Sequence, residues 1–443
     1  MTDYLIYNAE TDTYIAGSET VCGGKNVIPT VLDPNSSLPE GFSFCVRDLM
    51  KDMVDFTFIC QDIKEYPAPH SEGFSCFWNG GIFDYGGYST MNRNLIRRLN
   101  AMGANVKPIS YVAGMDIEQD EVEEFVRYSK QIIPRGSPCV YASVMSRPYD
   151  GPVIHYTMME SDGQLNPGFL ETLQHADEIW VPSVWNFHNF LNSGVKPPIY
   201  IMPLGVDVNL FSPENNQPAL FSSGVSSMVI LSVLSVQWRK GLDVLIKAYC
   251  DKFHDTEHTS LVLMGRESLG RSVKDEVVKL VKQTGVKNPP HIVVCETKIP
   301  SRVMPRFYNA GNIFALFSRG EGWGLPYCEA AACGLPIVGS EHGSQMMFLD
   351  KSDCYLVKPD IKVTVDKSMQ TISNAYIGTT FADFSEDAIH QAGLAIGDAV
   401  WDCATENTRK ARSCRKRVVE NFSWDSAAKN VYNRLSEICN TGN

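Results

Sequence analysis

Two glutamates, Glu321 and Glu329, lie in a glycine-rich segment that reads SRGEGWGLPYCEAAACGLPIVGS (318–340). A loop with three glycines leads into a stretch that predicts a helix. The helix should begin at Pro326, because proline fits a first helical turn, and end at Gly334, because glycine adopts the left-handed conformation of a helix stop. Such a loop offers unpaired backbone N–H groups and the positive end of a helix dipole, which suits a phosphate. The glutamates would repel a phosphate, so we expect them to bind hydroxyl groups of a sugar or a ribose instead.

Two further groups fit an anionic ligand. Arg239 and Lys240 directly precede a helical pattern, GLDVLIKAY, and basic residues at a helix start oppose its dipole, which favours a functional reason for them. A surface-exposed basic helix start is the alternative. The pair Gly86 and Gly87 precedes the first helical pattern and permits a close approach of the backbone to a ligand, although a simple turn also explains it.

These groups need a scaffold, and the hydrophobic pattern predicts one. From Phe74 the chain reads as a strand, a glycine-rich loop, a helix that ends at Gly103 and a second strand, and further strand-like runs follow up to PIYIMPL. After a proline-framed linker (203–213), a second series begins with MVILSVL and continues through SLVLMG, HIVVCE, NIFALFS and LPIVGS. Two doubly wound α/β domains in tandem, with a ligand cleft between them, are therefore expected.

Composition limits the function further. The chain has 443 residues and a formal net charge of −12, which argues against nucleic acid as a partner. Its 13 cysteines form no C-x-x-C pair and indicate free thiols in a reducing compartment rather than a disulfide or zinc framework. The first residues do not resemble a signal peptide, and no run of ~18 apolar residues predicts a membrane span. We therefore expect a cytoplasmic protein; peripheral contact with the cytosolic face of a membrane and the oligomeric state stay open.

The stretch GEGWGLPYCEAAACGLPIV resembles the signature of the retaining glycosyltransferases of the GT-B fold, family 4 (glycosyl transferases group 1), and the resemblance extends over residues 74–435. It implies an α/β GT-B fold with two Rossmann-like doubly wound domains that face a central cleft. In this family the first glutamate, here Glu321, contacts the donor sugar and the second, Glu329, holds the nucleotide's ribose. The donor is also approached by the backbone of the intervening residues, here Gly322, Trp323, Gly324 and Leu325.

The same resemblance assigns the other groups. Arg239 and Lys240 would neutralise the diphosphate leaving group, although the family often has an additional arginine where Leu234 stands here. Gly86 and Gly87 would let the backbone approach the donor phosphate and the acceptor. Backbone groups near Cys295 would face the nucleobase.

A third stretch, HYTMMESD, resembles a subgroup of the family and contains His155 and Glu160. We expect both to lie near strand ends at the cleft. His155 would touch the donor sugar or the acceptor; a buried histidine that bonds to backbone is the alternative. Glu160 would contact the acceptor or make a structural hydrogen bond.

The resemblance also divides the chain. Residues 1–70 are expected to form an appended N-terminal segment, and residues 71–205 the N-terminal acceptor domain. Residues 206–424 are expected to form the nucleotide-sugar donor domain. The last helix, in 425–443, would cross back and complete the first domain.

The implied reaction moves a sugar from a UDP- or GDP-sugar to a hydroxyl of a glycan, a glycolipid or a small molecule, with retention of configuration. No bound metal or cofactor is expected, since basic side chains and a helix N-terminus neutralise the diphosphate and the chain has no Asp-x-Asp triplet. A nicotinamide-dependent oxidoreductase is disfavoured, because no G-x-G-x-x-G follows a strand with an acidic residue about twenty positions on. The alternatives that remain are another GT-B enzyme, such as a sugar epimerase or a phosphorylase, and a catalytically silent GT-B partner subunit.

Overall fold

The computed structural model describes residues 5–8 and 13–16, and residues 73–441 except 110–116, 144–148, 214–224, 255, 257, 269, 297–298, 367–368 and 370–375. In the N-terminal segment, β1 (Leu5–Asn8) and β2 (Thr13–Ala16) pair antiparallel. The rest of the appended segment lies outside the described residues.

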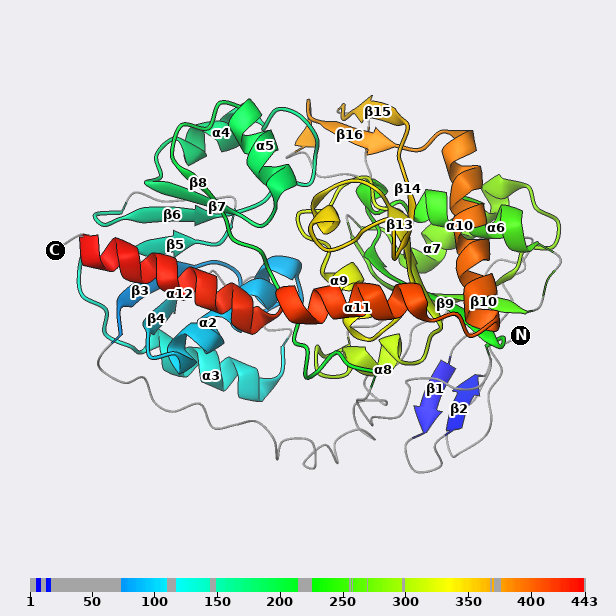
Figure 1. The fold of residues 1–443 in the computed structure, drawn as a ribbon, viewed down its shortest axis with the longest axis horizontal. Helices are drawn as coiled ribbons and strands as arrows, with labels where there is room; N and C mark the ends of the chain where they lie inside the picture. Colours follow the sequence, from blue (N-terminus) through cyan, green and yellow to red (C-terminus); the bar gives the residue numbers. More distant parts are fainter. Residues whose placement is uncertain are drawn as a thin grey trace.

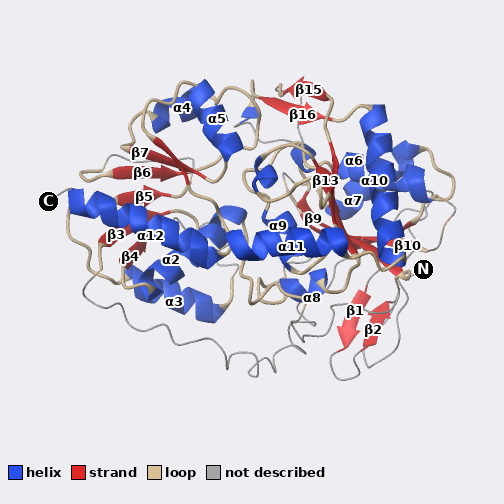
Figure 2. Cartoon of the chain, in the orientation of Figure 1, coloured by secondary structure: helices blue, strands red, loops and turns tan. Residues whose placement is uncertain are grey.

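The first domain is built on a six-stranded parallel sheet. Its strands follow the order β4-β3-β5-β6-β7-β8. They are β3 (Ser75–Asn79), β4 (Asn105–Ile109), β5 (Cys139–Tyr141), β6 (Val153–Tyr156), β7 (Glu178–Val181) and β8 (Ile199–Ile201). The connecting helices are α2 (Gly87–Ala101), α3 (Gln119–Ser129), α4 (Pro167–Leu173) and α5 (Val184–Asn192). Helices lie against the sheet (Figure 2), and its strands β5, β6 and β7 are almost entirely buried, as is typical of parallel sheets.

The second domain contains another six-stranded parallel sheet, in the order β11-β10-β9-β12-β13-β14. Its strands are β9 (Met228–Ser235), β10 (Thr259–Arg266), β11 (His291–Cys295), β12 (Ile313–Leu316), β13 (Ile337–Ser340) and β14 (Tyr355–Val357). Its helices are α6 (Leu242–Phe253), α7 (Val273–Thr284), α8 (Met304–Tyr308), α9 (Leu325–Ala332), α10 (Glu386–Ala404) and α11 (Arg409–Asn421). Short 3-10 helices η2 (Trp238–Lys240) and η3 (Ser344–Met347) and an antiparallel pair, β15 (Ile361–Thr364) and β16 (Thr380–Asp383), complete it. In chain order the sheet is 3-2-1-4-5-6, the arrangement of dinucleotide-binding folds.

The expected fold class is confirmed: two doubly wound α/β domains stand in tandem. The predicted glycine stops are confirmed too, because Gly103 and Gly334 have φ of 92° and 81°. Helix α9 begins at Leu325, one residue before the predicted start. No helix or strand was predicted between β13 and the last helix, where the structure has β14, the β15–β16 pair, α10 and α11.

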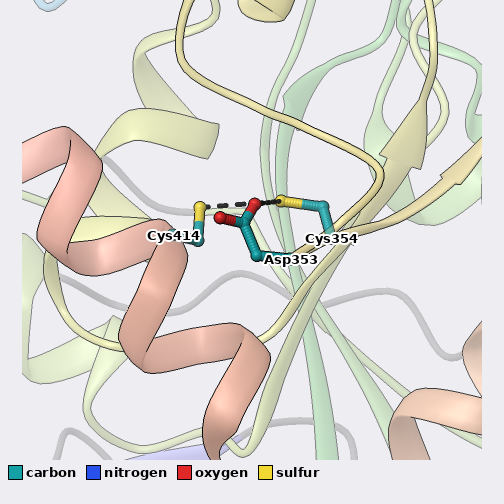
Figure 3. A group of neighbouring side chains, drawn as sticks. All are labelled: Asp353, Cys354 and Cys414. Carbon is teal, nitrogen blue, oxygen red and sulfur yellow. Dashed lines mark hydrogen bonds between the residues drawn. The ribbon is translucent and has the colours of Figure 1, made fainter.

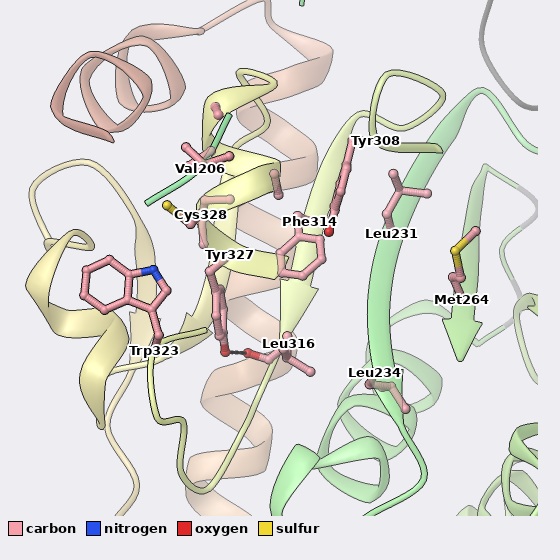
Figure 4. Packing of buried hydrophobic residues seen from close by; sticks show 14 of the residues in the cluster. Val206, Leu231, Leu234, Met264, Tyr308, Phe314, Leu316, Trp323, Tyr327 and Cys328 are labelled. Atoms are coloured by element: carbon pink, nitrogen blue, oxygen red, sulfur yellow. Dashed lines mark hydrogen bonds between the residues drawn. The ribbon is translucent and has the colours of Figure 1, made fainter. Parts of the chain in front are cut away.

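The core of the second domain supports the glycine-rich segment directly. Phe314 of β12 contacts Tyr327 of α9 and Tyr308 of α8, at ring-centre distances of 5.6 and 6.0 Å (Figure 4). Trp323, which is 2% exposed, packs against Phe348. The apolar side chains of this segment therefore anchor it in the core, and its polar side chains Ser318, Arg319 and Glu321 are buried as well.

The two domains are tied together by the last helix, α12 (Trp424–Thr441). Figure 1 shows α11 and α12 nearly end to end, with α11 over α9 of the second domain and α12 over α2 of the first. Arg98 of α2 forms ion pairs with Asp207 (3.1 Å) and Asp425 (2.6 Å). The domain boundaries themselves stay a prediction. No helix in the described part of the chain is both long and apolar enough to cross a membrane.

Candidate functional site

The site lies where the strand order of the second sheet reverses. Strand β9 stands between β10 and β12, so the chain leaves β9 in one direction and β12 in the other. Ligands of doubly wound sheets bind at this point, beyond the carboxyl ends of the strands. The loops that follow β9 and β12 meet here, since the backbone N–H of Arg319 donates to the carbonyl of Arg239 at 2.7 Å.

A glycine fixes the contact between these loops. Gly241 ends η2 with φ 63°, and a Cβ atom there would lie 1.8 Å from the carbonyl oxygen of Phe317. Only glycine permits this approach. The approach places Arg239 and Lys240 of η2 beside Glu321 of the loop after β12.

The basic pair and the first glutamate form a buried ionic cluster. Lys240 Nζ lies 2.7 and 2.8 Å from the two carboxylate oxygens of Glu321. Arg239 Nη1 lies 3.6 Å from Glu321 Oε2, and both cations are 12% exposed. Burial lowers the pKa of Lys240 from its ordinary value, and Glu321 opposes that change. The structure thus brings the adjacent pair Arg239 and Lys240 to a glutamate that lies 81 positions beyond Lys240 in the sequence.

The fourth member of the cluster comes from the first domain. Glu160 Oε1 lies 3.2 Å from Arg239 Nη2, and Tyr376 donates a hydrogen bond to Glu160. Burial would lower the pKa of Arg239, but Glu160, Tyr376 and Glu321 raise it overall. Glu160 therefore connects the first domain to Arg239 and Tyr376 of the second, and its contact with an acceptor stays a prediction.

Glu329 lies on α9 and carries a separate carboxylate. Its Oε2 accepts a hydrogen bond of 2.7 Å from Tyr308. Burial raises the pKa of Glu329 to about 7, and the hydrogen bond from Tyr308 acts in the opposite direction. Near neutral pH this group changes its charge, and in its ionised form it accepts hydrogen bonds from hydroxyls.

The glycines of the loop after β12 are required by close contact with the first domain. A Cβ atom at Gly320 would lie 1.8 Å from the carbonyl oxygen of Glu160, and one at Gly322 would lie 2.5 Å from Met158. Gly324 caps α9 with φ 93°. The loop therefore presses its backbone against the segment after β6, with its amides at the start of α9.

The glycine pair of the first domain faces the same helix. A Cβ atom at Gly87 would lie 3.9 Å from Leu325 of α9. Asp84, which the sequence analysis missed, accepts hydrogen bonds from the N–H of Gly86 (2.5 Å) and from Ser89 (2.7 Å) and fixes this loop. An acidic residue two positions before a glycine pair is the signal that would have identified it.

Two expected residues lie apart from the cluster. His155 of β6 is fully buried and stacks on Tyr141, and burial lowers its pKa to about 4. The burial expected under the alternative for His155 is present, but neither ring nitrogen has a hydrogen-bond partner among the described residues, so the backbone bond of that alternative is absent. Cys295 ends β11, which β10 separates from β9, and burial raises its pKa to about 12.

One further arginine, absent from the expected set, organises the site. Arg319 donates two hydrogen bonds to Asp243 (2.8 and 2.7 Å) and one to Asp383 (2.5 Å). Its guanidinium also lies 4.3 Å from the ring centre of Trp238. Arg319 thereby joins η2, α6 and β16.

Within the described residues, one group has the spacing of metal ligands. Cys354 Sγ lies 3.6 Å from Cys414 Sγ and 3.6 Å from Asp353 Oδ1 (Figure 3). Both oxygens of Asp353 already accept hydrogen bonds, from Arg417 and from Ser413. The group therefore acts as an anchor that ties α11 to the turn before β14.

Comparison with solved structures decides the fold. HepE of Anabaena, solved with UDP and glucose, superposes with a TM-score of 0.58 at 13% identity, over 82% of this chain and 99% of that chain. A sucrose-phosphate synthase of Thermosynechococcus elongatus gives 0.60 at 18% identity, over 83% of this chain and 100% of that chain. The fold is GT-B.

Sequence comparison places the likeness in the second domain. Residues 227–374 match the family model described as Glycosyl transferases group 1. A D-inositol 3-phosphate glycosyltransferase of Xylanimonas cellulosilytica is 31% identical over 153 residues, which are 33% of this chain and 35% of that protein. The chain spans about a third to a half of the length of the curated relatives it matches. The matched segment contains both cations of η2, Glu321 and Glu329.

Proposed function

We propose that this chain is a glycosyltransferase that moves a sugar from a nucleotide-diphosphate sugar to an acceptor hydroxyl. The observation that carries the proposal is the ionic cluster of Arg239, Lys240 and Glu321 at the reversal point of the second sheet, beside the start of α9. Two buried cations and a helix N-terminus can bind a diphosphate, and carboxylates beside them can bind sugar hydroxyls.

In this proposal the residues have separate roles. An ammonium has three N–H groups, so Lys240 can keep its bond to Glu321 and still donate to a phosphate oxygen. Arg239 and Lys240 stabilise the charge that develops on the leaving diphosphate. Glu321 orients the sugar through a hydroxyl, and Glu329 binds the ribose. The backbone of residues 322–325 and of the Gly86–Gly87 pair lies against the donor, and backbone near Cys295 faces the base.

We infer a retaining reaction by front-face displacement. The bond between the anomeric carbon and the phosphate oxygen breaks while the acceptor oxygen bonds to the same face of that carbon. The acceptor proton passes to the leaving phosphate. Glycosidases retain configuration with two carboxylates about 5–5.5 Å apart; we assign Glu321 and Glu329 to hydroxyls and propose no covalent intermediate.

The substrates follow by class. HepE was solved with UDP and glucose, and a matched mannosyltransferase of Mycolicibacterium smegmatis is named as GDP-mannose-dependent, so UDP- and GDP-sugars are the donors to test first. We propose that the first domain reads the acceptor, that no metal or cofactor is required, and that family 4 describes the enzyme. The cytoplasmic location stays a prediction.

A thermal-shift screen tests the proposal, because a ligand that binds only the folded protein raises its melting temperature. We expect UDP or GDP, and the matching nucleotide sugar, to raise the melting temperature in the presence of a chelator. Donor hydrolysis with and without added acceptors then separates a transferase from an epimerase or a phosphorylase. If no nucleotide binds, the silent partner subunit replaces the proposed enzyme.

A further inference from the structure

A second set of contacts between the two domains involves uncharged side chains that none of the proposed steps uses. Asn186 and Ser183 lie at the start of α5 in the first domain, and Ser344 lies at the start of η3 in the second. All three are fully buried. Ser344 Oγ lies 2.8 Å from Ser183 Oγ and accepts a hydrogen bond of 2.7 Å from Asn186 Nδ2.

The side chain of Asn186 is hydrogen-bonded at both ends. Its Oδ1 accepts from the backbone N–H of Met159 at 2.8 Å. Its Nδ2 also points to the carbonyl of Gly322, at 3.4 Å. Buried amides and hydroxyls are stable only when their hydrogen bonds are made. The network is therefore complete only while the two domains are in contact.

This network ends on the glycine loop of the ionic cluster. Gly322 follows Glu321, and the backbone N–H of Ser344 donates to the carbonyl of Glu321 at 3.3 Å. Ser344 thus donates a backbone hydrogen bond to the loop of its own domain, and its hydroxyl accepts a hydrogen bond from Asn186 of the first domain. Two neighbouring carbonyls of the loop, at Glu321 and Gly322, depend on these two residues.

We propose that Asn186 and Ser344 form a buried polar latch that positions the glycine loop for the donor only when the two domains are closed. Asn186 is a positioning residue of the first domain that acts on the donor loop of the second. The proposal rests on the proposed function for the identity of the ligand. Donor entry then requires the latch to open, and its closure restores the loop geometry around Glu321.

The latch extends along the interface at Asp162. The backbone N–H of Asp162 donates to the carbonyl of Thr380 at 2.6 Å, and Asp162 Oδ1 lies 3.1 Å from His342 Nε2. These contacts lie nearer the surface than Asn186 and Ser344, since the side chains of His342 and Asp162 are 20% and 10% exposed. We therefore expect the fully buried pair to set the closed arrangement.

Ser344→Ala is the decisive variant, because it removes one hydroxyl and little volume. Small-angle scattering of the nucleotide-free protein should show a larger radius of gyration for Ser344→Ala than for the wild type. The KM for the nucleotide sugar should rise roughly tenfold, because the buried amide of Asn186 loses its shortest hydrogen bond in the closed form, and kcat should change less. Ser344→Thr, which keeps the hydroxyl, should restore both values.

Asn189→Ala is the matched control, since Asn189 lies one turn along α5 and, among the described residues, its side chain donates to the carbonyl of Ser161 in its own domain at 3.3 Å. It should match the wild type in both measurements. Asn186→Ala should behave as Ser344→Ala does, and its circular dichroism establishes that it folds.

Two results would overturn the latch. One is a radius of gyration for Ser344→Ala equal to that of the wild type. The other is a larger radius with an unchanged KM, which would mean that the contacts join the domains without positioning the loop. If the wild type binds no nucleotide, the proposed function fails, and the scattering comparison alone decides whether the latch sets domain closure.

Discussion

At the scale of single residues, charge balance governs the site. Lys240 and Arg239 are buried beside Glu321 and Glu160, so two cations face two carboxylates. An incoming diphosphate adds negative charge to a balanced cluster, and burial strengthens each of these interactions. The cations must therefore shift part of their hydrogen bonding from the carboxylates to the phosphates.

Replacement of Lys240 tests this exchange. Lys240→Ala should lower kcat about 10²–10³-fold, as loss of a group that stabilises developing charge does in other enzymes. Steady-state transfer or donor-hydrolysis rates measure it. Lys247→Ala removes the same charge from the exposed side of α6, where Lys247 pairs with Asp251, and should leave the rate unchanged. Equal rates for Lys240→Ala and the wild type would contradict the leaving-group role.

Glu329 gives a pH-dependent prediction. Burial raises its pKa to about 7 in the folded protein, above its ordinary value of 4.5, so the folded state binds more protons than the unfolded state between these values. The stability that this proton gives is fully present below about pH 4.5 and is lost as the pH rises through about 7.

Glu329→Gln should therefore raise the melting temperature at pH 8 relative to the wild type, and the difference should vanish near pH 4.5. Melting curves across this range measure it. The variant should also bind nucleotide more weakly at pH 8, because the neutral amide replaces a carboxylate that accepts from the ribose. A constant difference in melting temperature at all pH values would show that burial does not perturb Glu329.

The sequence predicted the residues of the cluster but not their contacts. Local sequence patterns identified these residues: the spacing of Glu321 and Glu329, and the basic pair of η2 before a helical pattern. Arg319 and Asn186 were missed because a single polar residue has no periodic signal, and its partners lie far away in the chain. The sheet order brings those partners together, and no local pattern encodes it.

At the scale of elements, close backbone contacts decide which segments can meet. Gly241 and Gly320 each occupy a position where a Cβ atom would lie 1.8 Å from a carbonyl oxygen. The first contact joins the two loops of the second domain, and the second joins the domains. Glycine at these positions therefore serves packing between loops as well as access for a ligand.

Helix α11 depends on a buried ion pair. Asp353, whose side chain is 2% exposed, accepts from Arg417. Asp353→Asn leaves that guanidinium without its counter-charge and should cost about 2–4 kcal/mol, a little below the range for breaking a fully buried pair because Arg417 is 29% exposed. Thermal unfolding should show a lower melting temperature.

The control for this prediction is on the same helix. Glu420→Gln breaks the exposed pair with Lys416, at 4.0 Å, and should change the stability by less than about 0.5 kcal/mol. If the two variants unfold at the same temperature, the Asp353 pair does not anchor α11.

The elements that the sequence analysis missed have weak patterns. β15 has four residues of which three are exposed, so it shows no alternation, and β14 has only three residues. Helix α11 buries only Ala411, Cys414 and Val418 among many charged residues. Helix α10 contains Gly393, which lowers helix propensity and allows close packing on α6, where its Cβ would lie 3.1 Å from a carbonyl oxygen.

At the scale of the whole molecule, two domains are in contact, and each is built on a six-stranded parallel sheet. The strand series and the linker predicted two domains, and the structure confirms this architecture. The relative placement of the domains was not predictable, because it rests on isolated contacts such as Glu160 with Arg239 and Asn186 with Ser344. Helix α12 adds a continuous connection from the second domain to the first.

The central claim is that a nucleotide diphosphate binds where η2 meets the glycine loop. Hydrogen–deuterium exchange, with and without the nucleotide that gives the largest thermal shift, tests it most directly. We predict slower exchange in peptides that cover 236–246 and 318–332, with the largest effect at the amides that precede α9. Binding that slows exchange only elsewhere, for example in the first sheet alone, would contradict the account.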